Sequence, residues 1–535
     1  MTKKINLTFL IILLLYSLFC ASQLGMTWDT TFHYDLGKER LDYLFSLGSN
    51  KVNEDTYIYS RLYPGVYSTI SALIVQFFPR KYIVEIIYLT NLTFSALTIL
   101  GISKISTELF NKQIGKIAFI ICFFNPIFFG HMAINSIDTI IAFSNIWFFY
   151  IILKYLKNQG NKKKTKNYII FSSICLGLGL GVRLSFIATL IPIFLFIFIE
   201  IFYFKIFIKK NFSIKVFFQD TIKVLIFSYL ILILFWPHTH PNVLILPFKF
   251  AMEGLTFGWG VPLMLFNGET ILTTEFPKSY ILINLFYKMP EFIVIGFAIF
   301  GCLFYKIGPY LKKEIKNFYI KIFLIFSIII FPNILLFFSP YSIYDGIRLF
   351  LYIIPFICII PSILIFFIFK MIDKNFYKFI FYFLIILKIF FLFNFFSLTP
   401  YHYVYLNVFA GKYYENSKKF ENDYWGASTK KLISSINKND EIFKKDRVKI
   451  AVCGLPEDAQ KHYLSKLKKL NFKIVNKSEY YDYIIMNNRA VWDIYSDFTT
   501  VKNPQTCFEK FSGEDIAKIQ RRGLILSKFT KNSHN

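Results

Sequence analysis

Acidic residues and cysteines are both scarce in this chain of 535 residues. Asp and Glu together number 33 against 60 Lys and Arg, which leaves a formal net charge of +27. The seven cysteines lie far apart and none forms a Cys-x-x-Cys pair, so most of them are best interpreted as buried small hydrophobic residues. A glycine-rich phosphate loop is missing, because Gly454 stands alone. No internal repeat is evident, which weakens the case for a transporter built from inverted repeats.

Apolar residues are abundant instead. The composition is 55% hydrophobic and 20% aromatic, with 67 Phe. A soluble globular protein has far less apolar surface to hide, so we expect an integral membrane protein. Helices that cross the membrane several times then predict a mainly α fold of the polytopic kind.

Apolar runs of spanning length recur through the first three quarters of the chain. They predict about eleven transmembrane helices, at residues 6–24, 82–101, 115–131, 138–154, 167–182, 184–204, 220–237, 291–306, 318–338, 349–369 and 375–397. A further run, 64–78, is short for a span, and we expect it to lie along the membrane interface. The first run resembles a signal peptide but is long for one, so we favour an uncleaved signal anchor.

The positions of the basic residues test this assignment. With the N-terminus inside, the inner connections carry a strong excess of Lys and Arg, whereas the outer ones are close to neutral. A full span at 64–78 would invert every later loop and abolish this asymmetry. The basic charge is therefore a topology signal and not a nucleic-acid-binding patch. We expect a multi-pass protein of a bacterial plasma (inner) membrane, with a cytoplasmic N-terminus and an extracytoplasmic C-terminus.

The chain is predicted to consist of two domains. Residues 1–397 form the transmembrane domain, with two long outer loops at 25–81 and 238–290. The first loop is expected to hold an amphipathic helix near Phe32–Leu47. Residues 398–535 are polar and long enough for one small extracytoplasmic domain.

Alternating segment types predict an α/β fold for this C-terminal domain. RVKIAVCGL, FKIV and YDYIIMN are typical of strands, and EDAQKHYLSKLKKL between the first two has the pattern of an amphipathic helix. Cys453 and Cys507 both lie here. Two interpretations of them stay open: a disulfide if the domain faces the outside, or separate buried thiols.

The stretch Met26–Leu36, MTWDTTFHYDL, directly follows the first apolar run. Asp29 therefore lies a few residues beyond the membrane face, beside Trp28 and other aromatic residues of the kind favoured at the membrane–water interface. A carboxylate at that depth can touch both a lipid headgroup and an aqueous acceptor. We interpret Asp29 as a catalytic carboxylate; the alternative is an ordinary solvated loop aspartate.

Other polar residues gather in segments predicted to lie outside, where polar groups at membrane depth are candidates for function. Asp138, Arg183 and Arg348 are the most informative. A carboxylate suits a general base, and a guanidinium group matches the oxygens of a phosphate. This mixture favours an enzyme that acts on a lipid phosphate. The candidate substrate-binding residues are His33, His131, Asn135, Asn267, Glu269, Tyr344 and Asp345.

The charged candidates also have purely structural explanations. Asp138 stands at the start of a predicted helix, where Asp is a favoured N-cap. Arg183 and Arg348 can extend from helix ends to the interface without binding a ligand. His238 and His240 are candidates for metal binding, but two histidines with no fixed carboxylate are weak support. A divalent metal is therefore a weak alternative, and no cofactor is expected.

Six segments spread over nearly the whole chain resemble the motifs of one family, in the same order. They are WDTTFHYDLGK, NPIFFGHMAINSID, LMLFNGE with the following EFPKSYILINLFYKMP, YDGIRLFLYIIP, YHYVYLNVFAG and ENDYWGAS. The sequence resembles the C-type (GT-C) membrane glycosyltransferases, the superfamily of protein O-mannosyltransferases and aminoarabinose transferases that use lipid-linked sugars. Each motif alone is weak, but six in register are specific for the superfamily.

The resemblance implies transfer of a sugar from a polyprenyl-phosphate donor to an acceptor hydroxyl, usually with inversion at the anomeric carbon. Asp29 is then the base that deprotonates the acceptor, and Asp138 helps to hold the acceptor or the donor sugar. Arg183 and Arg348 are then the residues that bind the donor phosphate. The implied partners are the membrane lipid, the polyprenyl-phosphate sugar, and a protein, lipid or glycan acceptor.

The sequence departs from the family pattern at two positions. Thr30 follows Asp29, where many relatives have Glu, and Leu349 follows Arg348, where relatives have His. Roles that depend on those two missing side chains are therefore not carried over.

Two other functions stay open. A transporter or flippase of lipid-linked saccharides would place charges or broken helices at mid-membrane depth, whereas Lys388 is the plainly charged residue within a predicted span. An envelope assembly protein would leave the acids and arginines unexplained. The glycosyltransferase is therefore the main hypothesis.

Overall fold

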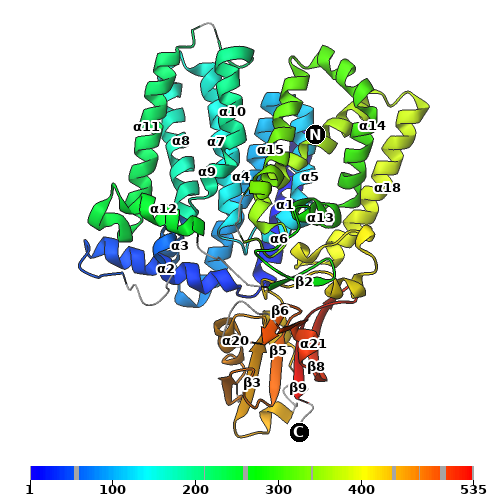
Figure 1. Cartoon of the computed structure of the whole chain (residues 1–535). Helices are drawn as coiled ribbons and strands as arrows, with labels where there is room; N and C mark the ends of the chain where they lie inside the picture. The colour runs from blue at the N-terminus through cyan, green and yellow to red at the C-terminus, as the bar shows by residue number, and fades with distance from the viewer. Residues whose placement is uncertain are drawn as a thin grey trace.

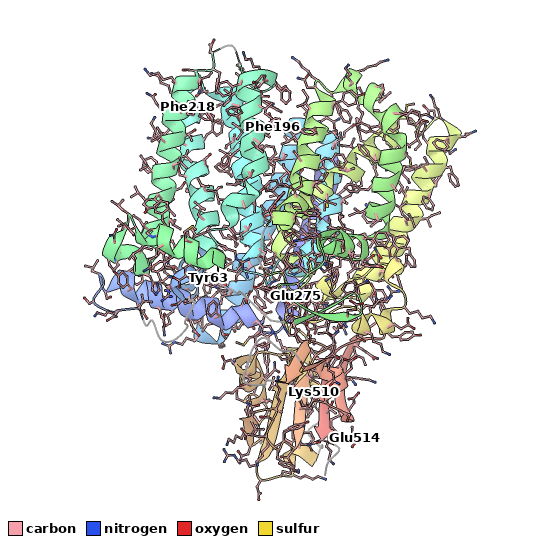
Figure 2. The ribbon with its side chains drawn as sticks, in the orientation of Figure 1. Tyr63, Phe196, Phe218, Glu275, Lys510 and Glu514 are labelled. Atoms are coloured by element: carbon pink, nitrogen blue, oxygen red, sulfur yellow. A yellow bond between two sulfur atoms is a disulfide. The ribbon has the colours of Figure 1, made fainter. Side chains whose placement is uncertain are left out.

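The computed structural model describes residues 2–52, 60–209, 211–256, 263–338, 342–436, 441–468, 470–493 and 502–532. Most of the helices run side by side, and a small domain of strands packs at one end of them (Figure 1). Phe196 and Phe218 lie among the helices remote from this domain, whereas Lys510 and Glu514 lie within it (Figure 2). The architecture is that of a polytopic helical membrane protein with a small C-terminal α/β domain, as predicted.

Eight helices of the described residues are long and apolar enough to cross a membrane. They correspond to eight of the eleven predicted spans. They are α4 (Ile83–Leu109), α7 (Asp138–Asn158), α8 (Lys162–Val182), α11 (Ile214–Leu234), α14 (Glu291–Glu314), α15 (Phe318–Phe338), α18 (Asn375–Ser397), and the continuous run of η5 (Arg348–Ile353), α16 (Ile354–Ile357) and α17 (Ile359–Lys370).

The three remaining predicted spans are helical but bent or interrupted. The run at 115–131 divides because the Asn125 side chain accepts a hydrogen bond from the Phe128 N–H and Pro126 begins a new helix. The first span, α1, is joined to the next helix through a bend of 90°. The elements concerned are α1 (Thr2–Gln23), α5 (Lys112–Phe123), α6 (Pro126–His131), α9 (Phe186–Thr189), α10 (Ile191–Ile199) and the π-helix η3 (Glu200–Phe204).

The helix after the bend, α2 (Trp28–Phe45), lies across the ends of the upright helices (Figure 1). It begins before the predicted start at Phe32, so Asp29 is in its first turn and not in a loop. Thr30 supports this start, because its Oγ1 accepts a hydrogen bond from the Thr27 N–H at 3.1 Å. The residue that departs from the family pattern therefore helps to fix the helix that carries Asp29.

The run predicted to lie along the interface forms α3 (Val66–Gln76), which packs against α2. At 11 residues it is too short to cross the bilayer. The two helices approach closely at Gly37, where an added Cβ would overlap the carbonyl oxygen of Ser68. The absence of a side chain at Gly37 thus allows α2 to lie flat on α3.

Gly37→Ala should lower the thermal stability of the protein. The added methyl group forces α2 away from α3, and overpacking of this kind typically costs about 1–3 kcal/mol. The melting temperature in detergent measures the effect. Gly301→Ala is the matched control, because a Cβ there would meet no atom of the described residues within 4 Å. Equal melting temperatures for the two variants would contradict the close packing.

The second outer loop, predicted at 238–290, is folded around short elements. They are η4 (Pro237–Asn242), α12 (Leu246–Thr256), the hairpin of β1 (Leu263–Phe266) and β2 (Glu269–Leu272), and α13 (Tyr280–Lys288). The first outer loop adds η1 (Ser60–Leu62) and η2 (Arg80–Tyr82). In Figure 1, α12 lies beside α3 at the ends of the upright helices, and α13 and β2 lie nearer to the C-terminal strands.

The C-terminal sheet has five strands in the order β4-β3-β5-β9-β8. Its first three strands, β3 (Val448–Cys453), β4 (Phe472–Val475) and β5 (Tyr483–Met486), are parallel and match the predicted strands. The predicted helix is α20 (Glu457–Leu464). The sequence did not indicate the antiparallel hairpin that completes the sheet, β8 (Gly513–Arg521) with β9 (Leu524–Asn532).

Cys453 and Cys507 form a disulfide between the end of β3 and the start of α21 (Cys507–Lys510). Of the other cysteines, Cys302 is exposed on the outside of α14, which differs from the burial expected for it.

The remaining elements are η6 (His402–Val404), η7 (Val408–Ala410), η8 (Tyr413–Lys418), α19 (Thr429–Ser434), η9 (Glu441–Phe443), β6 (Ala490–Asp493) and β7 (Lys502–Thr506). The boundary between domains at residue 397 stays a prediction.

Candidate active site

Two acids and two arginines that the sequence singles out converge at one place. Arg348 Nη1 lies 3.8 Å from Asp29 Oδ2, and Arg348 Nε lies 3.9 Å from Asp138 Oδ2. Arg183 Nη1 lies 3.8 Å from Asp138 Oδ1. These four residues, which are distant in the chain, therefore lie together in one cluster.

Each of the four residues sits at the end of a helical element. Asp29 is in the first turn of α2, and Asp138 is the first residue of α7. Arg183 is the C-cap of α8, and Arg348 begins η5. Because α7 and α8 are antiparallel neighbours, the start of one and the end of the other meet at the same end of the bundle.

Arg348 is the centre of the cluster. Its Nη1 also contacts Asp345 Oδ2 at 3.2 Å. Its guanidinium carbon lies 5.0 Å from the ring centre of Tyr344 and 4.6 Å from that of Trp425. Cation–π contacts of this kind hold a guanidinium in place without consuming its hydrogen-bond donors.

The longer ion pairs leave polar atoms available. Separations of 3.8 and 3.9 Å exceed the length of a direct hydrogen bond. Within the described residues, Arg348 Nε and Asp138 Oδ1 are buried without a hydrogen-bond partner. Buried polar atoms are normally satisfied, so these two suit a polar ligand or ordered water.

Asp138 is positioned by Asn135. The Asn135 side-chain amide donates to Asp138 Oδ2 at 2.9 Å, and its Oδ1 accepts from the backbone N–H groups of Ile137 and Asp138. The expectation that Asp138 itself caps the helix is wrong, because Asp138 is inside the first turn and Asn135 satisfies the free backbone donors. The Asp138 carboxylate is thereby left to face the arginines.

The two predicted histidines of this region are buried. His33 packs against the rings of Phe32 and Tyr63. Burial, followed by the nearby charges of Arg183 and Arg40, lowers the pKa of His33 to about 3, so the ring is neutral at pH 7. His131 has Nδ1 2.7 Å from the Ile127 carbonyl oxygen and Nε2 2.9 Å from Tyr424 Oη. His131 thus joins α6 to the segment that carries Trp425.

Asn267 and Glu269 lie on the turn of the β1–β2 hairpin and are exposed. Asn267 and Gly268 have φ values of 52° and 94°. Asn-Gly is the favoured sequence for a two-residue hairpin turn with both φ angles positive. The turn itself therefore accounts for Asn267, and neither residue has a described contact with the four charged side chains.

His238 and His240 lie on η4. His240 has Nδ1 3.0 Å from Tyr43 Oη and Nε2 2.9 Å from the Ile233 carbonyl oxygen. Both ring nitrogens of His240 are thus occupied by hydrogen bonds. In the part of the chain that the structure describes, no group of three or more His, Cys, Asp or Glu side chains is arranged to hold a metal ion.

The sequence did not single out Arg489 or Trp425, which complete the cluster. Arg489 lies three residues beyond the end of β5 and directly before β6, and its Nη2 lies 3.0 Å from Asp345 Oδ1. Polar residues directly after a buried strand, here Asn-Asn-Arg, were the available signal for Arg489. Trp425 lies within the motif ENDYWGAS, so the family resemblance marked its segment without marking the residue itself.

The environment of Asp29 changes its acidity. Burial raises the pKa of the Asp29 carboxyl above its ordinary range, the Arg348 guanidinium opposes this increase, and the Asp345 carboxylate adds to it. About a quarter of the side chain stays exposed, at 23%. A carboxylate with a raised pKa that is still open to an incoming group is suited to accept a proton.

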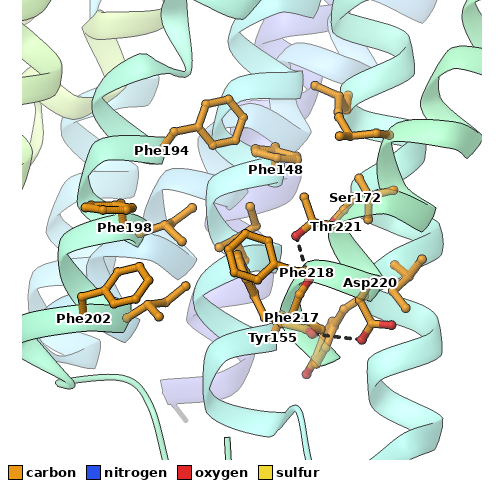
Figure 3. Close-up of a pocket in the computed structure, with 18 residues that line it drawn as sticks. Phe148, Tyr155, Ser172, Phe194, Phe198, Phe202, Phe217, Phe218, Asp220 and Thr221 are labelled. Atoms are coloured by element: carbon orange, nitrogen blue, oxygen red, sulfur yellow. Dashed lines mark hydrogen bonds between the residues drawn. The ribbon is translucent and has the colours of Figure 1, made fainter. Parts of the chain in front are cut away.

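A cavity of about 250 Å³ lies elsewhere, between α7, α8, α10 and α11. Phe148, Phe194 and Phe198 point into it, and Tyr155 donates a hydrogen bond to Asp220 at its rim (Figure 3). Tyr155 is near the opposite end of α7 from Asp138, about 25 Å away at the rise of an α-helix. This apolar cavity is therefore separate from the charged cluster.

Known proteins share this architecture. Residues 64–240 match the model of a family described as dolichyl-phosphate-mannose-protein mannosyltransferase. The crystal structure of ArnT from Cupriavidus metallidurans in the apo state aligns with a TM-score of 0.50 at 9% identity, over 89% of this chain and 87% of that chain. The protein has the GT-C fold.

Two further solved structures are similar to this protein. ArnT from Cupriavidus metallidurans bound to undecaprenyl phosphate aligns with a TM-score of 0.49 at 9% identity, over 90% of this chain and 87% of that chain. The apo oligosaccharyltransferase of Archaeoglobus fulgidus aligns with a TM-score of 0.47 at 10% identity, over 89% and 69%. No curated protein matches the sequence.

Four of the motifs by which the sequence resembles the GT-C family contribute residues to the charged cluster, whereas Arg183 and Arg489 lie outside these motifs. WDTTFHYDLGK is the start of α2 and contains Asp29, and NPIFFGHMAINSID ends at Asp138. YDGIRLFLYIIP contains Asp345 and Arg348, and ENDYWGAS contains Trp425. Four motifs from different parts of the chain therefore meet at one site.

Proposed function

We propose that this protein is an integral-membrane glycosyltransferase, which moves a sugar from a polyprenyl-phosphate donor to an acceptor hydroxyl at the outer face of the membrane. The observation that carries the proposal is the contact of Arg348 with both Asp29 and Asp138, at 3.8 and 3.9 Å. A phosphate needs a cation, and a hydroxyl nucleophile needs a base. The site offers both within one cluster.

In the proposed reaction, Asp29 accepts the proton of the acceptor hydroxyl while the hydroxyl oxygen attacks the anomeric carbon of the donor sugar. The bond between that carbon and the phosphate oxygen breaks, and the polyprenyl phosphate leaves with one additional negative charge. Arg348 and Arg183 stabilise this charge as it develops. Because there is a single displacement, the configuration at the anomeric carbon inverts.

Asp138 has a different role from Asp29 in this proposal. It contacts both arginines and receives a hydrogen bond from Asn135, so it holds the two guanidinium groups in one orientation. Its Oδ1 has no hydrogen-bond partner among the described residues, and so it can accept a hydrogen bond from a hydroxyl of the sugar. We therefore expect Asp138 to orient the donor while Asp29 carries out the proton transfer.

We propose that the site faces the extracytoplasmic side of a bacterial plasma membrane. The charge asymmetry of the loops supports this orientation. The disulfide between Cys453 and Cys507 supports it independently, because disulfides persist in oxidising compartments. The acceptor is then a protein, lipid or glycan on that side.

The position of the charged cluster favours an enzyme over a transporter of lipid-linked saccharides. A transporter would carry its binding groups near the bilayer midplane, where they can be reached from both sides. Asp29, Asp138, Arg183 and Arg348 instead occupy the ends of their helices, all at the end that faces the C-terminal domain. Such an arrangement serves a reaction at one membrane surface.

Comparison of the glycans of cells with and without the gene tests the proposed function. We expect mass spectrometry of lipids and proteins to show at least one glycan that is lost without the gene and restored by the wild-type protein. Expression of the Asp29→Asn variant at equal abundance should not restore it. Identical glycan profiles in both strains would contradict the proposal.

The pH profile of kcat/KM should show an acid limb set by Asp29. A base works only when deprotonated, so the rate falls as the pH decreases through the pKa. Burial raises the pKa of Asp29, so the limb should lie above the value of about 3.9 for an ordinary Asp. Asp345→Asn removes a charge that raises this pKa, and should move the limb to lower pH. A limb unmoved by Asp345→Asn would contradict the assignment.

A further inference from the structure

Arg489 is a residue of the C-terminal domain that reaches into the charged cluster. Its side chain is only 8% exposed, and its Nη2 pairs with Asp345 Oδ1 at 3.0 Å. Its Nη1 donates to the Tyr424 carbonyl oxygen at 2.9 Å. Its guanidinium carbon lies 5.7 Å from the ring centre of Trp28, the residue before Asp29. The Arg489 side chain thus contacts three segments of the chain, those of Asp345, Tyr424 and Trp28.

The disulfide fixes the backbone that carries Arg489. The Cys507 N–H donates to the Arg489 carbonyl oxygen at 3.0 Å, and the Asn487 N–H donates to the Cys453 carbonyl oxygen at 3.4 Å. The Asn487 side chain accepts from the Arg489 N–H at 3.0 Å. Each half-cystine is therefore hydrogen-bonded to the short segment 487–489, and the bond between the sulfurs joins the two attachments.

The charges of the cluster balance only when Arg489 is included. The carboxylates of Asp29, Asp138 and Asp345 face the guanidinium groups of three arginines. Lys288 and Glu421 are also buried beside Asp345, and they add one charge of each sign. Asp345 lies between two of these, with one oxygen toward Arg348 and the other toward Arg489. Without Arg489, Asp345 would compete with an incoming anion for Arg348, and the site would carry an excess negative charge.

We propose that Arg489 is a positioning residue for the donor phosphate, which neutralises Asp345 so that Arg348 can bind the phosphate, and that the disulfide between Cys453 and Cys507 holds Arg489 in place. This inference rests on the proposed function, because it takes a lipid phosphate as the ligand of Arg348. It gives the C-terminal domain a part in donor binding. Arg489 acts through Asp345 and Arg348 and not through the reacting atoms.

Titration of the purified full-length protein with undecaprenyl phosphate tests the inference. Arg489→Gln keeps a donor for the Tyr424 carbonyl but removes the charge, and it should weaken binding by about tenfold. Arg489→Lys should restore part of the affinity. Arg447→Gln is the matched control on the same domain, since Arg447 is exposed at the start of β3, and its affinity should equal that of the wild type.

A second substitution separates charge from structural damage. If the unneutralised Asp345 carboxylate is the cause, the double variant Arg489→Gln with Asp345→Asn should recover the affinity that Arg489→Gln loses. A loss of folding would not be recovered in this way. Equal affinity of wild type and Arg489→Gln, or a loss that Asp345→Asn does not recover, would overturn the inference. If Arg489→Gln does not fold, the comparison of Arg489→Lys with and without Asp345→Asn decides.

The kinetic constants provide a further test, including the part played by the disulfide. Arg489→Gln and the double variant Cys453→Ala with Cys507→Ala should each raise the donor KM more than they lower kcat. Combining all three substitutions should add little to either effect, because both act on one side chain. Fully additive effects would overturn the role of the disulfide.

Failure of this inference is distinguishable from failure of the proposed function. If the wild-type protein binds no undecaprenyl phosphate, the proposed donor class is wrong. If the wild type binds it and Arg489→Gln binds it equally well, the donor class stands and only the role of Arg489 is lost.

Discussion

Asp29→Asn should lower the rate of sugar transfer by about 10²–10⁴-fold, the usual contribution of a positioned general base. The amide has the size of the carboxyl group but cannot accept the acceptor's proton. Arg348 keeps its contacts with Asp138 and Asp345 in this variant, so the fold should persist. The rate is measured at saturating donor, on protein matched for abundance in the membrane.

Asp35→Asn is the control for this prediction. Asp35 lies on the same helix as Asp29, but it is exposed and makes no described contact with Arg348. The control variant should keep the wild-type rate. Full activity of Asp29→Asn would remove Asp29 from the catalytic role, whereas equal losses in both variants would point to a general effect on α2.

Arg348→Ala should weaken donor binding by about 10²-fold, the effect expected when one partner of a buried charge pair is truncated. The substitution removes the cation and leaves the acids of the cluster facing one another. Arg348→Lys keeps the charge but loses the planar fork that matches a phosphate, so its affinity should be intermediate. Titration with undecaprenyl phosphate measures both variants.

Arg61→Ala is the control for a general loss of positive charge. Arg61 is half exposed, forms an ion pair with Glu253, and lies outside the cluster. The donor affinity of this variant should not change. If a folded Arg348→Ala protein binds undecaprenyl phosphate as the wild type does, Arg348 does not contact the phosphate. If Arg348→Ala does not fold, Arg348→Lys carries the same test.

Hydropathy was sufficient to predict eight of the spans found among the described residues, whereas the orientation inferred from charge stays a prediction. A span depends mainly on a long apolar run, and the side on which a loop lies depends on its basic residues. Neither property depends on distant contacts. The breaks were harder to predict: the helix at 115–131 ends because Asn125 and Pro126 start a new one, which is a local signal that an apolar run conceals.

The acids and arginines could be predicted because each is a costly charge close to a membrane-spanning segment. Arg489 could not be found in this way, since it lies in a polar domain where a charged residue is ordinary. Its burial arises only when β5 is brought against the segment of Asp345. Asn267 illustrates the converse difficulty, because it was predicted as a substrate-binding residue. The Asn-Gly pair fits both a family motif and a hairpin turn, and the sequence alone does not distinguish these two explanations.

The right angle between α1 and α2 has a mechanical consequence. Asp29 lies on the first turn of α2, only a few residues beyond the end of α1. The length of α1 therefore fixes the position of Asp29 along the membrane normal. The carboxyl group cannot follow a substrate deeper into the bilayer. A thinner or thicker acyl layer shifts the lipid headgroups relative to a helix of fixed length. In the proposed reaction, the thickness of the surrounding membrane thereby sets how well the phosphate of the donor and the Asp29 carboxyl are aligned in height.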